Sequence, residues 1–230
     1  EQEFREAFGA DLVTMHEVRL DVLLWQGDTS SARRMLSSVS SDQAKLAKAR
    51  LALQKNKSGI SALLADVPES AKADPGLAFD TFQWHLARKR SDKAIKILLK
   101  HSANAIDLGQ AAKWAGPRLS VARDLLWDQK YQTAYSVASG HHLGLSSAYA
   151  ELEWLAGFIA LRKLNKPKLA LVHFKNHESA VGSEISLGRT YYWQGRALQA
   201  MGQSERAQRA YARGAKHQTS FYGLLSSEVA

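Results

Sequence analysis

Two histidines in the C-terminal half stand at a spacing that metal sites use. His173 and His177 lie four residues apart in the segment His-Phe-Lys-Asn-His, so a helix would place both imidazoles on one face. A zinc-protease site of this spacing also needs a glutamate between the histidines and a third ligand. Both are missing and Lys175 stands between the histidines, so we expect no metal here.

The sequence also lacks the motifs of the common cofactor and nucleophile sites. It has no phosphate loop, no dinucleotide-binding fingerprint and no Gly-x-Ser-x-Gly elbow. With no cysteine, it can form neither a disulfide, nor a thiolate nucleophile, nor a cysteine-based metal site. His141 and His142 follow Gly140 in a predicted turn, and we expect both to be exposed. We therefore predict no catalytic residue, no cofactor and no metal.

Positive charge is the chemical feature that the chain offers most clearly. The 31 Lys and Arg against 22 Asp and Glu give a net charge of +9, and the excess falls in residues 76–230. Two sets of basic residues would each form a stripe on one helix face: Lys93, Lys96 and Lys100, and then Arg206, Arg209, Arg213 and Lys216. Such stripes attract a polyanion, whereas the alternative is a solvated outer helix face. Nucleic acid is the less favoured polyanion, because no zinc finger, RNA-binding signature or single basic helix stands out.

The tryptophans offer rings that either stack on sugars or fill a core. Five of them stand where a helix would turn them inward, so we expect core positions for Trp25, Trp84, Trp127, Trp154 and Trp193. Trp114, next to Ala115-Gly116-Pro117, has no such explanation.

The elements that must position these residues are helices. The 35 alanines and 30 leucines outnumber the 22 valines, isoleucines and threonines, a composition that favours helix over strand. No apolar run approaches the ~20 residues that span a bilayer, and the first residues do not resemble a signal peptide. We expect an all-α fold with helices at residues 12–26, 29–37, 42–55, 59–66, 75–89, 92–101, 106–115, 117–128, 130–139, 147–163, 166–176, 184–201, 204–216 and 219–229. Their short connections predict antiparallel helical hairpins.

An internal repeat of 37 residues organises the C-terminal part. The aligned pairs are Trp154 with Tyr191, Phe158 with Gly195, Leu161 with Leu198, Ala170 with Ala207, and Phe174 with Tyr211. Large residues and glycine on one helix, followed by alanine and an aromatic residue on the next, are typical of tetratricopeptide-like hairpins. We therefore predict an α-solenoid, a superhelix of hairpins, as one domain over residues 1–230. The hairpins of residues 1–74 are less regular than those of 75–230, and residues 67–74 are the loosest stretch.

Four segments, in this order, resemble the superhelical non-catalytic region of the soluble lytic murein transglycosylases. They begin at Trp154 (W-L-A-G-F-I-A-L), Ala170 (A-L-V-H-F), Arg189 (R-T-Y-Y-W-Q-G-R-A) and Thr219 (T-S-F-Y-G). Asp74-Pro75-Gly76-Leu77 also resembles an upstream D-P-x-L segment of that family. The resemblance covers about residues 75–230 and implies that His173 packs beside Phe174.

The resemblance implies a periplasmic protein that acts on peptidoglycan. Such enzymes cleave the β-1,4 bond between N-acetylmuramic acid and N-acetylglucosamine and leave a 1,6-anhydro ring. One glutamate of a C-terminal lysozyme-like domain, in a Glu-Ser pair followed by G-L-M-Q, does this chemistry. Glu69-Ser70 and Glu178-Ser179 have no G-L-M-Q after them, so neither matches, and we expect the first turn of a short helix at Glu69.

Three functions follow from these patterns. The first is a non-catalytic scaffold, cut before its catalytic domain, that holds glycan strands or a cell-wall protein; its basic stripes would meet the carboxylates of peptidoglycan stem peptides. The second is a general tetratricopeptide-like adaptor that binds a protein partner. The third, which the sequence favours least, is a basic nucleic-acid binder.

Overall fold

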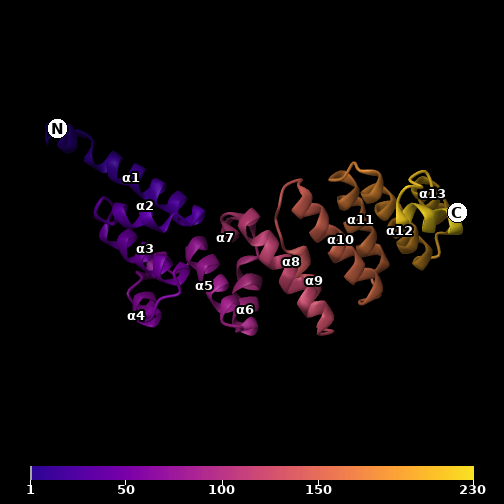
Figure 1. The fold of residues 1–230 in the computed structure, drawn as a ribbon, viewed down its shortest axis with the longest axis horizontal. Helices are drawn as coiled ribbons and strands as arrows, with labels where there is room; N and C mark the ends of the chain where they lie inside the picture. Colours follow the sequence, from indigo (N-terminus) through magenta and orange to yellow (C-terminus); the bar gives the residue numbers. More distant parts are fainter. Residues whose placement is uncertain (1) are drawn as a thin grey trace. The chain divides into compact units, whose positions relative to one another are not determined.

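The described chain is helical throughout. A computed structural model describes the backbone of residues 2–230 and the side chains of residues 13–230. Within these limits there are fourteen α-helices, two 3-10 helices and no strand, which confirms the predicted all-α class (Figure 1). None of the described helices combines the length and the apolar character that crossing a membrane requires.

The chain divides into two compact units. Unit 1 ends at Gln110, and unit 2 runs from Ala111 to Ala230. The single domain expected from the sequence stays a prediction, because two compact units can belong to one domain. The loosest stretch predicted from the sequence, residues 67–74, lies inside unit 1 and not at the division.

The first five α-helices of unit 1 pack around two apolar clusters. Its elements are α1 (Gln2–Gln26), α2 (Thr29–Arg34), η1 (Met35–Ser37), α3 (Ser41–Gln54), α4 (Ile60–Ala65), η2 (Glu69–Ala71), α5 (Pro75–Ala87), α6 (Ser91–His101) and α7 (Ala105–Leu108). Leu20, Leu24 and Leu51 belong to the cluster shared by α1, α2 and α3, and a second cluster joins α3 to α4 and α5. Helix α3 contributes residues to both clusters, so two of its faces are buried.

The start of α5 shows how the sequence sets a helix end in unit 1. Pro75 occupies the first turn, where a missing N–H costs nothing, and the carboxylate of Asp74 accepts a hydrogen bond from the Leu77 N–H at 2.6 Å. The predicted helix start at this Asp-Pro pair is confirmed. The first turn of a short helix expected at Glu69 is also confirmed, since η2 begins there.

Unit 2 is a series of α-helices joined by short connections. They are α8 (Ala111–Trp127), α9 (Tyr131–Ser139), α10 (Ser147–Arg162), α11 (Pro167–Ser179), α12 (Glu184–Ala200), α13 (Ser204–Gly214) and α14 (Phe221–Val229). Helix α8 packs on α9, α10 on α11, and α12 on α13, so that consecutive helices form hairpins. An aromatic core around Phe174, Trp193 and Tyr211 joins the last two hairpins, with Trp154 and Tyr222 packed against it.

The two last hairpins repeat one close contact. The ring of Phe174 on α11 lies against Gly157 on α10, where an added Cβ would come within 2.6 Å of the ring. The ring of Tyr211 on α13 lies against Gly195 on α12 in the same way. Each hairpin thus needs a glycine on its first helix to admit an aromatic ring from its second helix.

The expected break of α8 at Gly116-Pro117 is wrong. Helices 106–115 and 117–128, with a start at Gly116-Pro117, were expected, but α8 runs through Pro117 without a break. Trp114 and Arg118, on either side of the proline, are fully buried. Their packing holds the helix through a residue that costs an isolated helix about 3 kcal/mol. The helix expected at 12–26 also starts earlier, at Gln2.

The expected core position of Trp127 is also wrong, since its side chain is 88% exposed. The buried face of α8 carries Trp114, Val121 and Leu125, and the last residue of the helix points away from that face. Trp25 and Trp193 are buried, and Trp84 and Trp154 are partly buried, as expected. Trp114, which the sequence left unexplained, is one of the largest fully buried side chains.

Candidate functional site

The basic stripe predicted on residues 204–216 lies on the outer face of α13. Ala207 and Tyr211 turn inward, and Arg206, Arg209 and Arg213 are exposed on the other side. Lys216 is exposed beyond the end of the helix. Three of the four expected residues therefore share an exposed helix face, and Lys216 is exposed outside it.

Arg206, Arg209 and Arg213 line a hollow in unit 2 with a volume of about 330 Å³. Helix α11 contributes Lys175, an exposed residue that the sequence analysis did not single out as a binding residue. We call this site the basic hollow, and its lining is Leu171, Lys175, Gln194, Leu198, Arg206, Arg209, Ala210 and Arg213. Four cations from two helices thus converge on one concave surface, whose floor is partly apolar.

Arg213 is the fixed wall of the basic hollow. Its Nη2 donates to Glu178 Oε1 and to the Tyr191 hydroxyl, each at 2.6 Å, and its guanidinium lies 4.0 Å from the centre of the Tyr191 ring. Gln194 donates to the other oxygen of Glu178 at 2.7 Å. Burial alone would raise the pKa of Glu178, but the hydrogen bonds from Gln194 and Arg213 outweigh burial and lower it. Glu178 is therefore ionised at neutral pH and engaged with its neighbours.

The other predicted binding residues lie outside the basic hollow. Lys93, Lys96 and Lys100 are exposed on α6 and belong to unit 1. Lys216 is absent from the lining of the hollow. The structure therefore gathers only part of the predicted set, and it adds Lys175.

His173 and His177 point to separate partners instead of to a shared metal. His173 Nδ1 lies 2.6 Å from Glu153 Oε2, and His177 Nδ1 lies 2.6 Å from the Thr190 hydroxyl. Burial, and secondly the charge of Arg189, lower the pKa of His177 to about 4, so this imidazole is neutral. Within the described residues, no group of three acidic, histidine or cysteine side chains is placed to hold a metal ion.

Glu153 is the centre of a buried network that the sequence did not reveal. Its carboxylate accepts from His141 Nε2 at 3.0 Å, from His173 Nδ1 at 2.6 Å and from Asn176 at 3.2 Å. The Tyr135 hydroxyl lies 2.9 Å from His173 Nε2. Burial alone would raise the pKa of Glu153, but the hydrogen bonds from His141 and His173 lower it to about 2.

Glu153, His173 and Tyr135 are groups that an acid–base site could use. Their burial instead indicates a structural role. Glu153 and His141 are each 5% exposed and His173 is 7% exposed, so a substrate has no access to them. They join α9, α10, α11 and the loop before α10. The expectation that His141 is exposed is therefore wrong, while His142 is exposed. His173, which was expected to pack beside Phe174, is buried next to it in the chain and also pairs with Glu153 and Tyr135.

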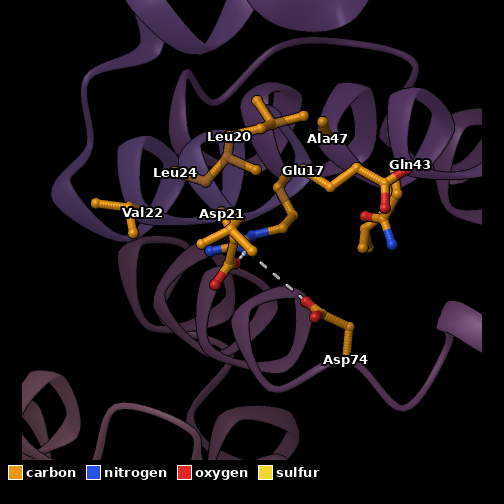
Figure 2. A pocket seen from close by; sticks show the side chains of 11 residues that line it. Glu17, Leu20, Asp21, Val22, Leu24, Gln43, Ala47 and Asp74 are labelled. Atoms are coloured by element: carbon orange, nitrogen blue, oxygen red, sulfur yellow. Dashed lines mark hydrogen bonds and ion pairs between the residues drawn. The ribbon is translucent and has the colours of Figure 1, made fainter. Parts of the chain in front are cut away.

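Unit 1 has a hollow of the opposite character, with a volume of about 300 Å³ between α1, α3 and the start of α5 (Figure 2). Arg50 lies at its inner side and is 1% exposed. Its Nε donates to Asp80 at 2.8 Å and its Nη1 to Asp21 at 2.7 Å, while Asp74 lies 3.8 Å from Nη1. Burial alone would lower the pKa of Arg50, but the surrounding carboxylates, Asp80 first, raise it, so Arg50 stays charged.

The glycine of the Asp74-Pro75-Gly76-Leu77 segment makes room for this arginine. An added Cβ on Gly76 would overlap the guanidinium of Arg50. Two carboxylates of the hollow, Asp21 and Asp74, are therefore paired with a buried internal cation, and the third, Glu17, accepts from the Ser40 hydroxyl at 2.6 Å, so this network is structural.

Comparisons of the chain with models of protein families, with curated proteins and with solved structures found no match in any of the three.

Proposed function

We propose that this chain is the non-catalytic superhelical part of a periplasmic soluble lytic transglycosylase. The parent enzyme would cleave peptidoglycan at the β-1,4 bond between N-acetylmuramic acid and N-acetylglucosamine, and a separate lysozyme-like domain would supply the catalytic glutamate. The chain itself would hold glycan strands or a cell-wall partner protein. Its hairpins would be tetratricopeptide-like repeats of an α-solenoid.

The observation that carries this proposal is that the resembling segments contact one another through their motif residues. Gly157 of the first segment receives Phe174 of the second, and Trp193 of the third packs against the same core. In the fourth segment, the Ser220 hydroxyl accepts from the Gly223 N–H at 3.0 Å and caps α14. Segments that resemble one family in sequence thus also form one packed unit.

The acidic residues of this chain support a non-catalytic part. Glu178, in one Glu-Ser pair, is bound to Arg213 and Gln194 and has a lowered pKa, whereas a general acid needs a raised one. Glu69, in the other pair, is exposed on η2 and pairs with Lys72 at 2.6 Å. A chain without a catalytic glutamate would act through what its surface binds.

Incubation with purified murein sacculi tests the proposal. The chain should sediment with the sacculi and release no 1,6-anhydro-muropeptides, as measured by mass spectrometry. The transglycosylase reading fails if the chain stays in the supernatant. Release of anhydro products would contradict the assignment of a non-catalytic part.

A tetratricopeptide-like adaptor is the second candidate, and the repeated glycine–aromatic contact favours it. The contact of Gly157 with Phe174 and of Gly195 with Tyr211 defines two equivalent hairpins, and stacked hairpins offer broad faces to protein partners. The adaptor would bind one protein partner without affinity for murein. Affinity capture combined with the sacculus assay separates the two functions.

A further inference from the structure

The basic hollow holds positive charge that the protein itself does not neutralise. Arg213 is paired with Glu178, and Arg209 lies 3.7 Å from Glu205 on the exposed side of α13. Among the described residues, no carboxylate lies within 4.0 Å of Lys175 or Arg206. Lys175 on α11 and Arg206 on α13, whose Nη1 donates only to the neutral Gln203 side chain, therefore keep a charge that is available to an anionic ligand.

The volume of the hollow limits the ligand to a small segment, and the cations of its lining favour an anionic one. Its volume of about 330 Å³ is at the lower end of what ligand pockets enclose. Arginine forks favour carboxylate or phosphate groups, which they bind in a bidentate manner. Leu171, Leu198 and Ala210 add apolar surface that suits the methylene and methyl groups of a peptide.

These features favour an acidic peptide over nucleic acid. Single-stranded nucleic acid is held by aromatic rings on which bases stack, and the lining of the hollow has no aromatic residue. The four cations also converge on one concavity instead of following an extended backbone. A chain of carboxylates on short aliphatic side chains fits both the charge and the apolar floor.

We infer that the basic hollow binds a carboxylate-bearing peptide, with Lys175 and Arg206 as its free cations and with Arg213 as a fixed wall. This inference rests on the proposed role of the chain as a non-catalytic binding scaffold. The carboxylates come either from the peptide portion of murein or from an acidic segment of a partner protein.

Fluorescence anisotropy on the full chain tests this inference. The probe is a labelled peptide of four Glu-Ala repeats, and its neutral counterpart has Gln-Ala repeats. Lys175→Ala combined with Arg206→Ala should weaken binding of the acidic peptide by at least about tenfold. The matched control, Lys93→Ala with Lys96→Ala, removes the same charge from unit 1 and should change binding less than twofold. All four side chains are exposed, so the far-ultraviolet circular dichroism of both variants should match that of the wild type.

Three results would overturn the inference: equal losses in the two double variants, equal binding of the Glu and Gln peptides, and tighter binding of duplex DNA than of the acidic peptide. The sacculus assay then separates the two proposals. Peptide binding through the hollow without sedimentation on murein would leave the inference standing with a protein partner and would remove the transglycosylase reading. If the chain sediments on murein and the Lys175→Ala, Arg206→Ala double variant binds the acidic peptide as well as the wild type does, the inference fails and the transglycosylase proposal stands.

Discussion

The two units differ in how their charged residues are paired. Unit 1 has nearly balanced charge, with 16 basic and 14 acidic residues, and it buries Arg50 among Asp21, Asp74 and Asp80. Unit 2 has 15 basic and 8 acidic residues, and it carries Lys175 and Arg206 on its surface. Unit 1 therefore surrounds its buried arginine with carboxylates. Unit 2 buries Arg118 against the Val137 carbonyl, at 2.7 Å, and gathers exposed cations in the basic hollow.

This contrast separates structural charge from charge that is available for binding. A buried guanidinium needs compensating partners inside the fold, because leaving its charge uncompensated costs several kcal/mol, so the carboxylates beside Arg50 stabilise the fold. An exposed cation on a concave surface costs the fold little and keeps its attraction for an anion. Variants in each unit test this difference.

The largest effect is expected from Arg50→Met in unit 1. Loss of the guanidinium leaves Asp80 buried without its ion-pair partner, so the free energy of unfolding should fall by about 3–5 kcal/mol. Urea unfolding followed by circular dichroism measures the loss. As control, Lys45→Ala removes an exposed pair with Asp66 at 3.8 Å and should cost less than about 1 kcal/mol. Similar losses in both variants would break the distinction between buried and exposed charge.

Acidification should weaken unit 2 through His177. Its pKa is about 4 in the folded chain and 6.5 in a model peptide, so the unfolded state binds more protons between these values. Stability should therefore fall as the pH drops from 6.5 to 4, by up to about 3 kcal/mol. Below pH 4.5, Glu153, whose pKa is about 2, adds a further loss.

The variant His177→Gln should flatten this dependence between pH 6.5 and 4. Gln132→Ala, at an exposed position of α9, removes no titratable group and is the control that should leave the slope unchanged. Urea unfolding at several pH values measures both slopes. An unchanged slope in the His177 variant would show that this imidazole is protonated in the folded chain as readily as in the unfolded one.

The glycine–aromatic contacts of unit 2 should respond to single methyl groups. Gly157→Ala and Gly195→Ala would force Phe174 and Tyr211 out of place, at a cost of about 1–3 kcal/mol each. Gly182→Ala places its methyl in open space and should stay within about 0.5 kcal/mol of the wild type. Thermal unfolding distinguishes the three variants. A neutral result for both core glycines would contradict equivalent close-packed hairpins.

The smallest effect is expected from Lys216→Ala. The residue belongs to the predicted stripe but lies outside the lining of the basic hollow, so binding of the Glu-Ala peptide should weaken less than twofold. Arg206→Ala alone should weaken it about fivefold. Anisotropy titrations compare the two. Equal losses would indicate a diffuse attraction along the stripe instead of a defined hollow.

The periodic parts of this fold could be predicted from the sequence, and the long-range polar contacts could not. Composition and helix-start signals such as Asp74-Pro75 predicted the helices, and the 37-residue period brought Phe174 and Tyr211 into alignment. Glu153 was missed because its partners His141 and His173 lie 12 and 20 residues away, on other elements. Its place beside Leu152 and Ala156 on a buried helix was the available signal.

The candidate site was predicted only in part, for the same reason. The spacing of Arg206, Arg209 and Arg213 revealed one side of the hollow, because residues on one helix face are periodic. Lys175 lies on α11, and no pattern along the chain tells that α11 and α13 line one hollow. The same limit explains Pro117, where tertiary packing overrides a local helix signal.

Hydrogen exchange of the full chain, with and without soluble murein strands that carry stem peptides, tests the central claim most directly. We expect slower amide exchange in α11 and α13 around Lys175 and Arg206, and no change in α6 around Lys93 and Lys96. Protection of α6 alone, equal protection of both units, or no protection at all would contradict it.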